Sequence, residues 1–204
     1  MSRTEMIERG IAQLQRSDPR LAPIIERAPR FDVRPTRNRF RAIARSIVAQ
    51  QISTAAAATI WQRVEAALGE QATARAVARL APDRLRDCGL SARKASYLLD
   101  LATRVDSGSL PLERLGRVDD EGVIEALTAV RGVGRWTAQM FLLFGLGRLD
   151  VLAVDDFGLK SAIRKLHRLE ALPDRETFTR LAEPWRPYAS IASWYCWRSL
   201  ESAD

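Results

Sequence analysis

The sequence predicts an all-α protein, and three observations favour that fold class. Apolar residues recur at helical spacing through most of the 204 residues. No run shows the strict alternation of a half-buried strand. Serine, aspartate, proline and glycine stand where helices would begin and end. The length is enough for one globular unit that buries its own core without disulfide or metal support.

The first half of the chain predicts three helices. An amphipathic helix over 3–16 is followed by an irregular connection, which four prolines indicate: Pro19, Pro23, Pro29 and Pro35. A long apolar stretch then runs over 39–68, with Gly69 as its expected stop. Residues 51–54 are expected to break this stretch into two helices.

The second half predicts a series of shorter helices. Pro82 begins one of them and Ser91 caps another. The expected ranges are 73–80, 82–88, 92–106, 119–130, 134–144, 155–167, 175–183 and 188–200.

The run from Leu127 to Ala138 predicts two helices joined by a tight hairpin. Gly132 and Gly134 would supply a positive φ or a close backbone approach. The amides of Val133, Gly134 and Arg135 would then lie unsatisfied at the positive end of a helix dipole. Such an arrangement is an anion site that fits a phosphate.

Composition is consistent with a nucleic acid partner. The net charge is +7, and almost all of the positive charge is arginine, the residue that forks onto phosphates and stacks on bases. Genome base content is an equally good explanation of the arginine excess, so charge alone does not decide function. Cys88 and Cys196 give no metal-ligand spacing. No signal segment or long apolar span is present, which predicts a cytoplasmic protein without membrane contact.

Two adjacent carboxylates, Asp155 and Asp156, come at the start of a predicted helix. Aspartate is a common helix N-cap, so one of them is expected to cap. A carboxylate in a low-dielectric site can also stabilise positive charge that develops in a transition state.

Together these motifs resemble the helix-hairpin-helix and aspartate signature of the DNA glycosylase superfamily. The Gly134–Ala138 run, the doubled aspartate and the Gln50–Ser53 stretch are similar to the 3-methyladenine DNA glycosylase II branch. The resemblance covers about 38–197. It implies a short form without an extra N-terminal domain, a helix-hairpin-helix glycosylase fold, and two helical lobes with the active-site cleft between them. Lobe A would span about 36–147, and lobe B about 1–35 plus 148–204.

The resemblance implies a monofunctional glycosylase of base excision repair that flips and hydrolyses alkylated purines, 3-methyladenine and 7-methylguanine. Asp156 would be the catalytic carboxylate, with Asp155 as the alternative or as the helix cap. Relatives that also cleave the strand carry a lysine where this chain has Trp136, so no lyase activity is expected. The alternative function is a non-catalytic helix-hairpin-helix DNA-binding protein.

The expected base pocket is aromatic, because methylated purines are cationic and attract ring faces. By resemblance its residues are Trp136, Met140, Phe157 and Trp194. Met140 departs from the tyrosine of a well-known member of the branch, which leaves the range of lesions open. Gln51 would be the wedge that fills the place of the flipped base.

The expected DNA-phosphate contacts are Gly132, Val133, Gly134 and Arg135. No cofactor is required, and the two cysteines exclude the four-cysteine iron–sulfur cluster of some relatives. By resemblance a structural Na⁺ or K⁺ would bind the backbone carbonyls of Thr128, Val130 and Val133. The expected partner is double-stranded DNA with alkylated bases, bound by a monomer in the cytoplasm at the nucleoid.

Overall fold

The computed structural model describes residues 1–68 and 72–201, and within these ranges all regular secondary structure is helical. The all-α prediction is therefore confirmed. The chain forms two compact units: unit 1 is Met1–Arg34 with Gly147–Asp204, and unit 2 is Pro35–Leu146. Among the described residues no helix combines the length and the apolar character that a membrane span requires. The predicted stop at Gly69 lies outside the described residues.

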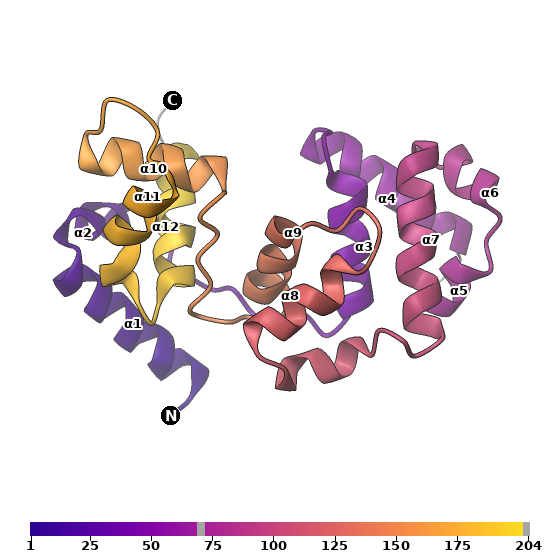
Figure 1. Cartoon of the computed structure of the whole chain (residues 1–204), viewed down its shortest axis with the longest axis horizontal. Helices are drawn as coiled ribbons and strands as arrows, with labels where there is room; N and C mark the ends of the chain where they lie inside the picture. The colour runs from indigo at the N-terminus through magenta and orange to yellow at the C-terminus, as the bar shows by residue number, and fades with distance from the viewer. Residues whose placement is uncertain (69–71, 202–204) are drawn as a thin grey trace. The chain divides into compact units, whose positions relative to one another are not determined.

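Unit 2 is built around a long helix, α7, that packs against α3, α5 and α6 (Figure 1). Ser91 caps α7 as predicted, since its hydroxyl accepts the Lys94 amide at 3.2 Å. The elements of this unit are α3 (Arg39–Ala49), α4 (Thr54–Leu68), α5 (Ala74–Ala78), α6 (Pro82–Asp87), α7 (Ala92–Asp106), η2 (Leu112–Arg117), α8 (Asp120–Thr128), α9 (Arg135–Met140) and the π turn η3 (Phe141–Gly145).

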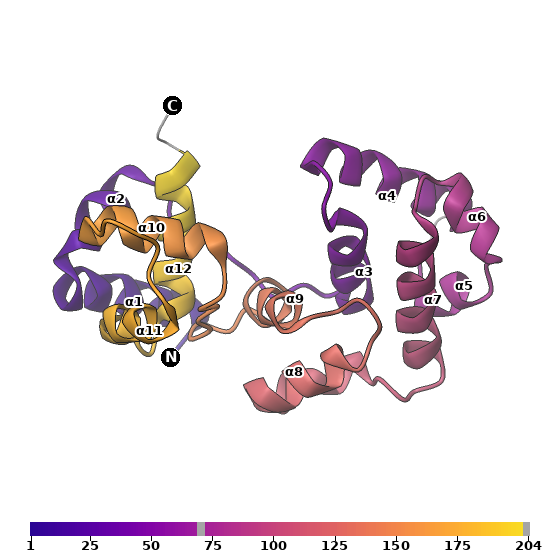
Figure 2. The same cartoon turned by 45° about the horizontal axis from the view of Figure 1, so that its top comes forward.

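Unit 1 packs its C-terminal helix, α12, against α10, α1 and α2 (Figure 2). The fully buried Phe178, Trp185 and Tyr195 contribute to its core. Its elements are α1 (Arg3–Ser17), η1 (Pro19–Leu21), α2 (Ala22–Arg27), α10 (Phe157–His167), α11 (Arg175–Ala182), η4 (Glu183–Trp185) and α12 (Ala189–Glu201).

Two predictions about local structure need correction. The irregular connection expected after the first helix contains η1 and α2, because Pro19 and Pro23 occupy first-turn positions where no amide donor is needed. The helix expected over 134–144 is α-helical only to Met140. It then widens into a π turn, in which the Leu146 amide donates to the Phe141 carbonyl at 2.9 Å.

The predicted break between α3 and α4 is confirmed. Gln51 has a φ of +58°, the left-handed conformation that ends a helix. Ser53 then begins the next helix by accepting the Ala56 amide at its hydroxyl, at 3.3 Å. This turn presents Gln51 as an exposed residue.

The one histidine of the chain, His167, ends α10 inside unit 1. Burial and the nearby Arg20 guanidinium lower the pKa of His167 below 6.5, and the Asp18 carboxylate opposes them in part. Its Nε2 atom is buried and has no hydrogen-bond partner among the described residues. The folded state therefore favours the neutral imidazole.

We expect His167 to make unit 1 sensitive to acid. The unfolded chain takes up this proton near pH 6.5, before the folded chain does, so the contribution of His167 to stability is full above pH 6.5 and falls as the pH drops below it. Thermal unfolding between pH 7.5 and 5.5 should show the melting temperature of the wild type falling faster than that of His167→Leu. Parallel curves would contradict this expectation.

Candidate active site

Asp156 lies at the N-cap of α10 and its side chain is buried, with 9% exposure. Its Oδ1 accepts two hydrogen bonds, one from the Leu159 amide at 2.7 Å and one from Trp197 Nε1 at 3.0 Å. The first is an ordinary helix cap, and the second comes from α12, 41 residues further along the chain. Two donors from different helices fix the orientation of this carboxylate.

Asp155 is the exposed member of the pair. Its Oδ2 accepts a hydrogen bond from Arg175 at the start of α11, and its side chain is 55% exposed. The expectation that Asp155 caps the helix is therefore wrong, because Asp156 holds that position. The backbone places Asp155 within the turn that precedes α10 and Asp156 at the N-cap of that helix.

Two aromatic residues predicted for the base pocket also lie in unit 1, in different surroundings. Phe157, beside Asp156, exposes 72% of its surface. Trp194 is held edge-on to Phe31 and Tyr195, with ring centroids 5.7 and 5.0 Å away. The Arg198 guanidinium lies 5.2 Å from the centroid of Trp194. Phe157 thus offers an open ring, and Trp194 a ring that already contacts a cation.

Trp197 was not predicted as a site residue. The sequence shows it only as one member of a C-terminal aromatic cluster, three residues after Trp194. An indole N–H can donate a hydrogen bond but cannot accept one. No local pattern identifies Asp156 as its acceptor.

The hairpin glycines have different roles. Gly132 has a φ of +78°, and a Cβ atom there would meet the Tyr97 ring at 2.0 Å. It therefore supplies both the left-handed turn and the close approach. Gly134 has a φ of −93°, and a Cβ atom there would meet nothing within 4 Å, so the prediction of a positive φ or a close backbone approach is wrong at this position.

The amide of Val133 is not open to an anion. It donates to the Val130 carbonyl at 3.1 Å and closes the hairpin turn, which corrects the prediction that it contacts phosphate. For Gly132 and Gly134, the described residues provide no hydrogen-bond acceptor for either amide. Gly134 is the N-cap of α9 and has no side chain with which to cap it. The hairpin can therefore offer backbone donors at these two glycines.

Arg135 forms a bidentate ion pair with Glu121 of α8. Its Nη1 lies 2.9 Å from one carboxylate oxygen, and its Nη2 donates to the other. The guanidinium lowers the pKa of Glu121. Both side chains are exposed, so this ion pair contributes little to stability. A phosphate would have to compete with Glu121 for Arg135.

The turn between α3 and α4 is attached to the hairpin. Gln50 Nε2 donates to the Gly132 carbonyl at 2.8 Å, a contact between residues 82 positions apart. Gln51 follows directly and is exposed. The structure thus brings the predicted wedge and the predicted phosphate site into one connected surface of unit 2.

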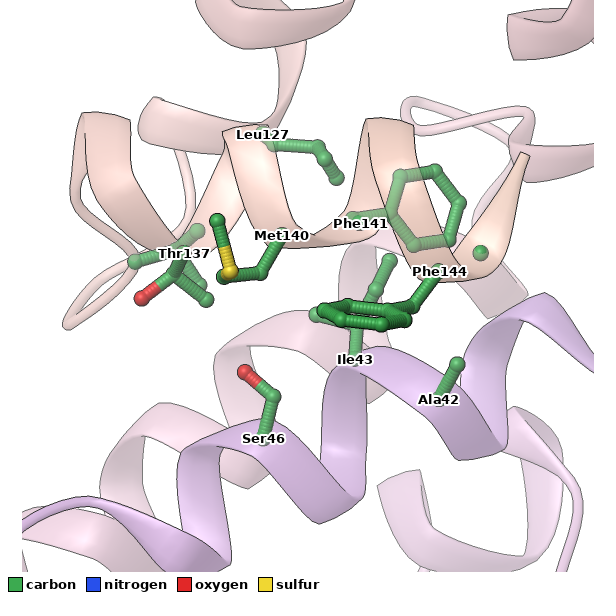
Figure 3. Close-up of a pocket in the computed structure, with 10 residues that line it drawn as sticks. Ala42, Ile43, Ser46, Leu127, Thr137, Met140, Phe141 and Phe144 are labelled. Carbon is green, nitrogen blue, oxygen red and sulfur yellow. The ribbon is translucent and has the colours of Figure 1, made fainter. Parts of the chain in front are cut away.

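Trp136 and Met140 lie one helical turn apart on α9. Trp136 is 47% exposed, and Met140 lines a cavity of about 160 Å³ between α9 and α3. Figure 3 shows Thr137, Met140 and Phe144 on one side of the cavity and Ile43 and Ser46 on the other. The lining is apolar apart from the hydroxyls of Thr137 and Ser46, and it carries no charged side chain.

The three carbonyls predicted to hold a cation belong to the end of α8 and the hairpin. Val130 accepts the Val133 amide and keeps a second lone pair, while no hydrogen bond to the carbonyls of Thr128 and Val133 occurs among the described residues. Carbonyl oxygens suit a hard monovalent ion. In the same described ranges no cluster of three or more His, Cys, Asp or Glu side chains could hold a metal.

The sequence is similar to those of known DNA repair proteins. The sequence profile of the HhH-GPD superfamily of base excision DNA repair proteins matches residues 44–187. YfjP from Bacillus subtilis, a putative DNA-3-methyladenine glycosylase, is 34% identical over 169 residues, which are 79% of this chain and 59% of that protein. This chain therefore spans less than two thirds of the length of YfjP.

Two solved structures share the fold over almost the whole chain. A DNA-3-methyladenine glycosidase from Bacillus halodurans has a TM-score of 0.84 and 34% identity, and the match covers 95% of this chain and 89% of that one. The 3-methyladenine DNA glycosylase Mag1 of Schizosaccharomyces pombe, in complex with abasic DNA, has a TM-score of 0.79 and 30% identity, with 94% and 97% covered.

We expect the two hairpin glycines to differ sharply in their tolerance of a side chain. Gly132→Ala should destabilise the protein by about 2–4 kcal/mol, because it combines a left-handed alanine with a clash against Tyr97. Gly134→Ala is the matched control and should change stability by less than about 0.5 kcal/mol. Urea unfolding measures both, and equal effects would contradict this account of the turn.

Proposed function

The chain belongs to the HhH-GPD superfamily of base excision DNA repair proteins, and on that premise we propose that it is a monofunctional DNA glycosylase for alkylated purines, 3-methyladenine and 7-methylguanine, in double-stranded DNA. The observation that carries the proposal is the buried carboxylate of Asp156, which donors from two helices fix in place. DNA binding alone requires no such group.

In the proposed reaction the bond between the sugar and the purine breaks and its electron pair leaves with the base. An alkylated purine carries a positive charge, so it departs as a neutral molecule and needs little acid catalysis. Positive charge meanwhile develops on the sugar, and the Asp156 carboxylate stabilises it. Water then adds to the sugar and loses a proton, which Asp156 can accept. The products are a free base and an abasic site.

Recognition of the base is assigned to apolar and aromatic surfaces. Trp136 and Phe157 expose their rings, and a cationic purine is attracted to such faces. We assign Met140 a part in base recognition because it lines the apolar cavity of unit 2. Trp194 completes the set, although a cationic base must compete with Arg198 for its ring.

We assign to the hairpin the binding of the DNA backbone. The amides of Gly132 and Gly134 are the proposed donors to a phosphate, and Arg135 would join them by releasing Glu121. A Na⁺ or K⁺ on the carbonyls of Thr128, Val130 and Val133 would add positive charge beside that phosphate. No other cofactor is proposed, and the protein would act on DNA as a monomer.

We propose hydrolysis without strand cleavage. Trp136 stands where strand-cleaving relatives carry a lysine, and an indole cannot form a Schiff base. Lys160 and Lys165 follow the acid on α10, and Lys94 donates to the Val48 carbonyl at 2.7 Å on the α7–α3 contact. A second candidate function, DNA binding alone, is favoured only by the hairpin and gives the Asp156 carboxylate no role beyond capping α10.

Base release from dimethyl-sulfate-treated duplex DNA tests the proposal. Wild type should release 3-methyladenine and 7-methylguanine, and Asp156→Asn should release them at least about 100-fold more slowly, because the amide keeps the helix cap and loses the charge. Asp155→Asn, which removes only the ion pair with Arg175, is the control and should stay within about threefold. DNA binding by wild type without any base release would support the non-catalytic alternative.

We expect Gln51 to raise the excision rate most when the damaged base is still paired with its partner. Unstacking costs a few kcal/mol, so Gln51→Ala should slow excision from paired DNA by about tenfold and excision from a mispaired site by less than about twofold. Gln62→Ala, an exposed glutamine on α4, is the matched control and should alter neither rate. Equal losses on both substrates would show that Gln51 is not a wedge.

A further inference from the structure

The indole of Trp197 reaches the start of α10 from α12. Its Nε1 lies 3.0 Å from Asp156 Oδ1, the same oxygen that accepts the Leu159 amide. Both side chains belong to unit 1, and α10 and α12 pack closely against each other there. The contact therefore rests on the packing of two helices within one compact unit.

We propose that Trp197 is a positioning residue for the Asp156 carboxylate, an inference that rests on the proposed function. The indole N–H and the Leu159 amide together fix the plane of the carboxylate against the developing charge on the sugar. Trp197 itself need not touch the base or the sugar.

A donor-only group is well suited to this task. An indole N–H can donate to a carboxylate and can neither accept its proton nor offer a competing lone pair. A helix cap alone leaves the carboxylate free to turn about its side-chain bonds. A second donor from another helix removes that freedom, and a hydrogen bond to a charged oxygen is stronger than one between neutral groups.

Gly158 leaves room for this contact. A Cβ atom on Gly158 would lie 3.1 Å from Asp156 Oδ1 and 3.1 Å from Trp197 Cδ1. Both distances are tighter than ordinary van der Waals contact, so a side chain here would displace the carboxylate or the indole. Its backbone has an ordinary helical conformation, so space, and not φ, accounts for the glycine.

Unit 1 contains a second bond of the same kind that serves as a control. Trp185 Nε1 donates to Asp18 Oδ2 at 3.0 Å, and both residues are almost completely buried. This pair joins η4 to the end of α1 and does not involve Asp156. Removing its donor measures the general effect of losing an indole–carboxylate bond in this unit.

The test compares single-turnover base release by saturating enzyme with affinity for DNA that carries an abasic-site analogue. Trp197→Phe should slow release about tenfold while DNA affinity stays within about twofold, because the carboxylate loses one donor and the binding surface is unchanged. Trp197→His, which can still donate, should recover part of the rate. Trp185→Phe should lower the melting temperature and leave the release rate within about twofold.

Gly158→Ala provides a second variant that does not remove a large side chain. Alanine favours a helix, so this change should not lower the melting temperature through helix propensity, yet release should slow by about threefold or more. If Trp197→Phe melts below the assay temperature, the release rate of Gly158→Ala tests the positioning role of Trp197 in its place.

The outcomes separate the two claims. No base release by wild type overturns the proposed function. Release by wild type together with an undiminished rate in Trp197→Phe or Gly158→Ala overturns the role of Trp197 alone. A rate loss in Trp185→Phe equal to that in Trp197→Phe would also overturn it, since the effect would then be structural.

Discussion

The two hydrogen bonds that meet at Asp156 Oδ1 link local folding to chemistry. The Leu159 amide makes the aspartate a helix cap, and the Trp197 indole ties that cap to another helix. The same residue marks the N-terminus of α10, which is the positive end of its dipole. Because one oxygen accepts from both helices, the group that begins α10 is also held in a fixed orientation. In the proposed reaction, folding of unit 1 alone orients this carboxylate, and DNA is not needed for it.

In unit 2, a few residues likewise fix the hairpin that we propose contacts the DNA backbone. Gly132 makes the hairpin turn against Tyr97, and Gln50 joins the carbonyl of that glycine to the turn carrying Gln51. The amide of Val133 closes the turn, which leaves the two glycines as its open donors. The proposed wedge and the proposed phosphate site are therefore joined by the Gln50–Gly132 hydrogen bond, so we expect DNA contact at one to affect the other.

The sequence predicts best what depends on neighbouring residues. Ser91 as a cap, the break at Gln51 and the glycine turn at Gly132 are local effects of backbone conformation, and each is present in the structure. The pairing of Trp197 with Asp156 depends on how α10 and α12 pack, and no local pattern encodes it. No residue pattern encodes which aspartate of the pair caps the helix, or the widening of α9 into a π turn.

The central claim is that a fixed carboxylate stabilises positive charge on the sugar. Affinity for two abasic-site analogues in otherwise identical DNA tests it most directly, one with a protonated pyrrolidine in place of the sugar and one with neutral tetrahydrofuran. Wild type should bind the cationic analogue at least about tenfold more tightly, and Asp156→Asn should abolish that difference while keeping its affinity for the neutral one. Equal affinity of the wild type for both analogues would contradict the claim.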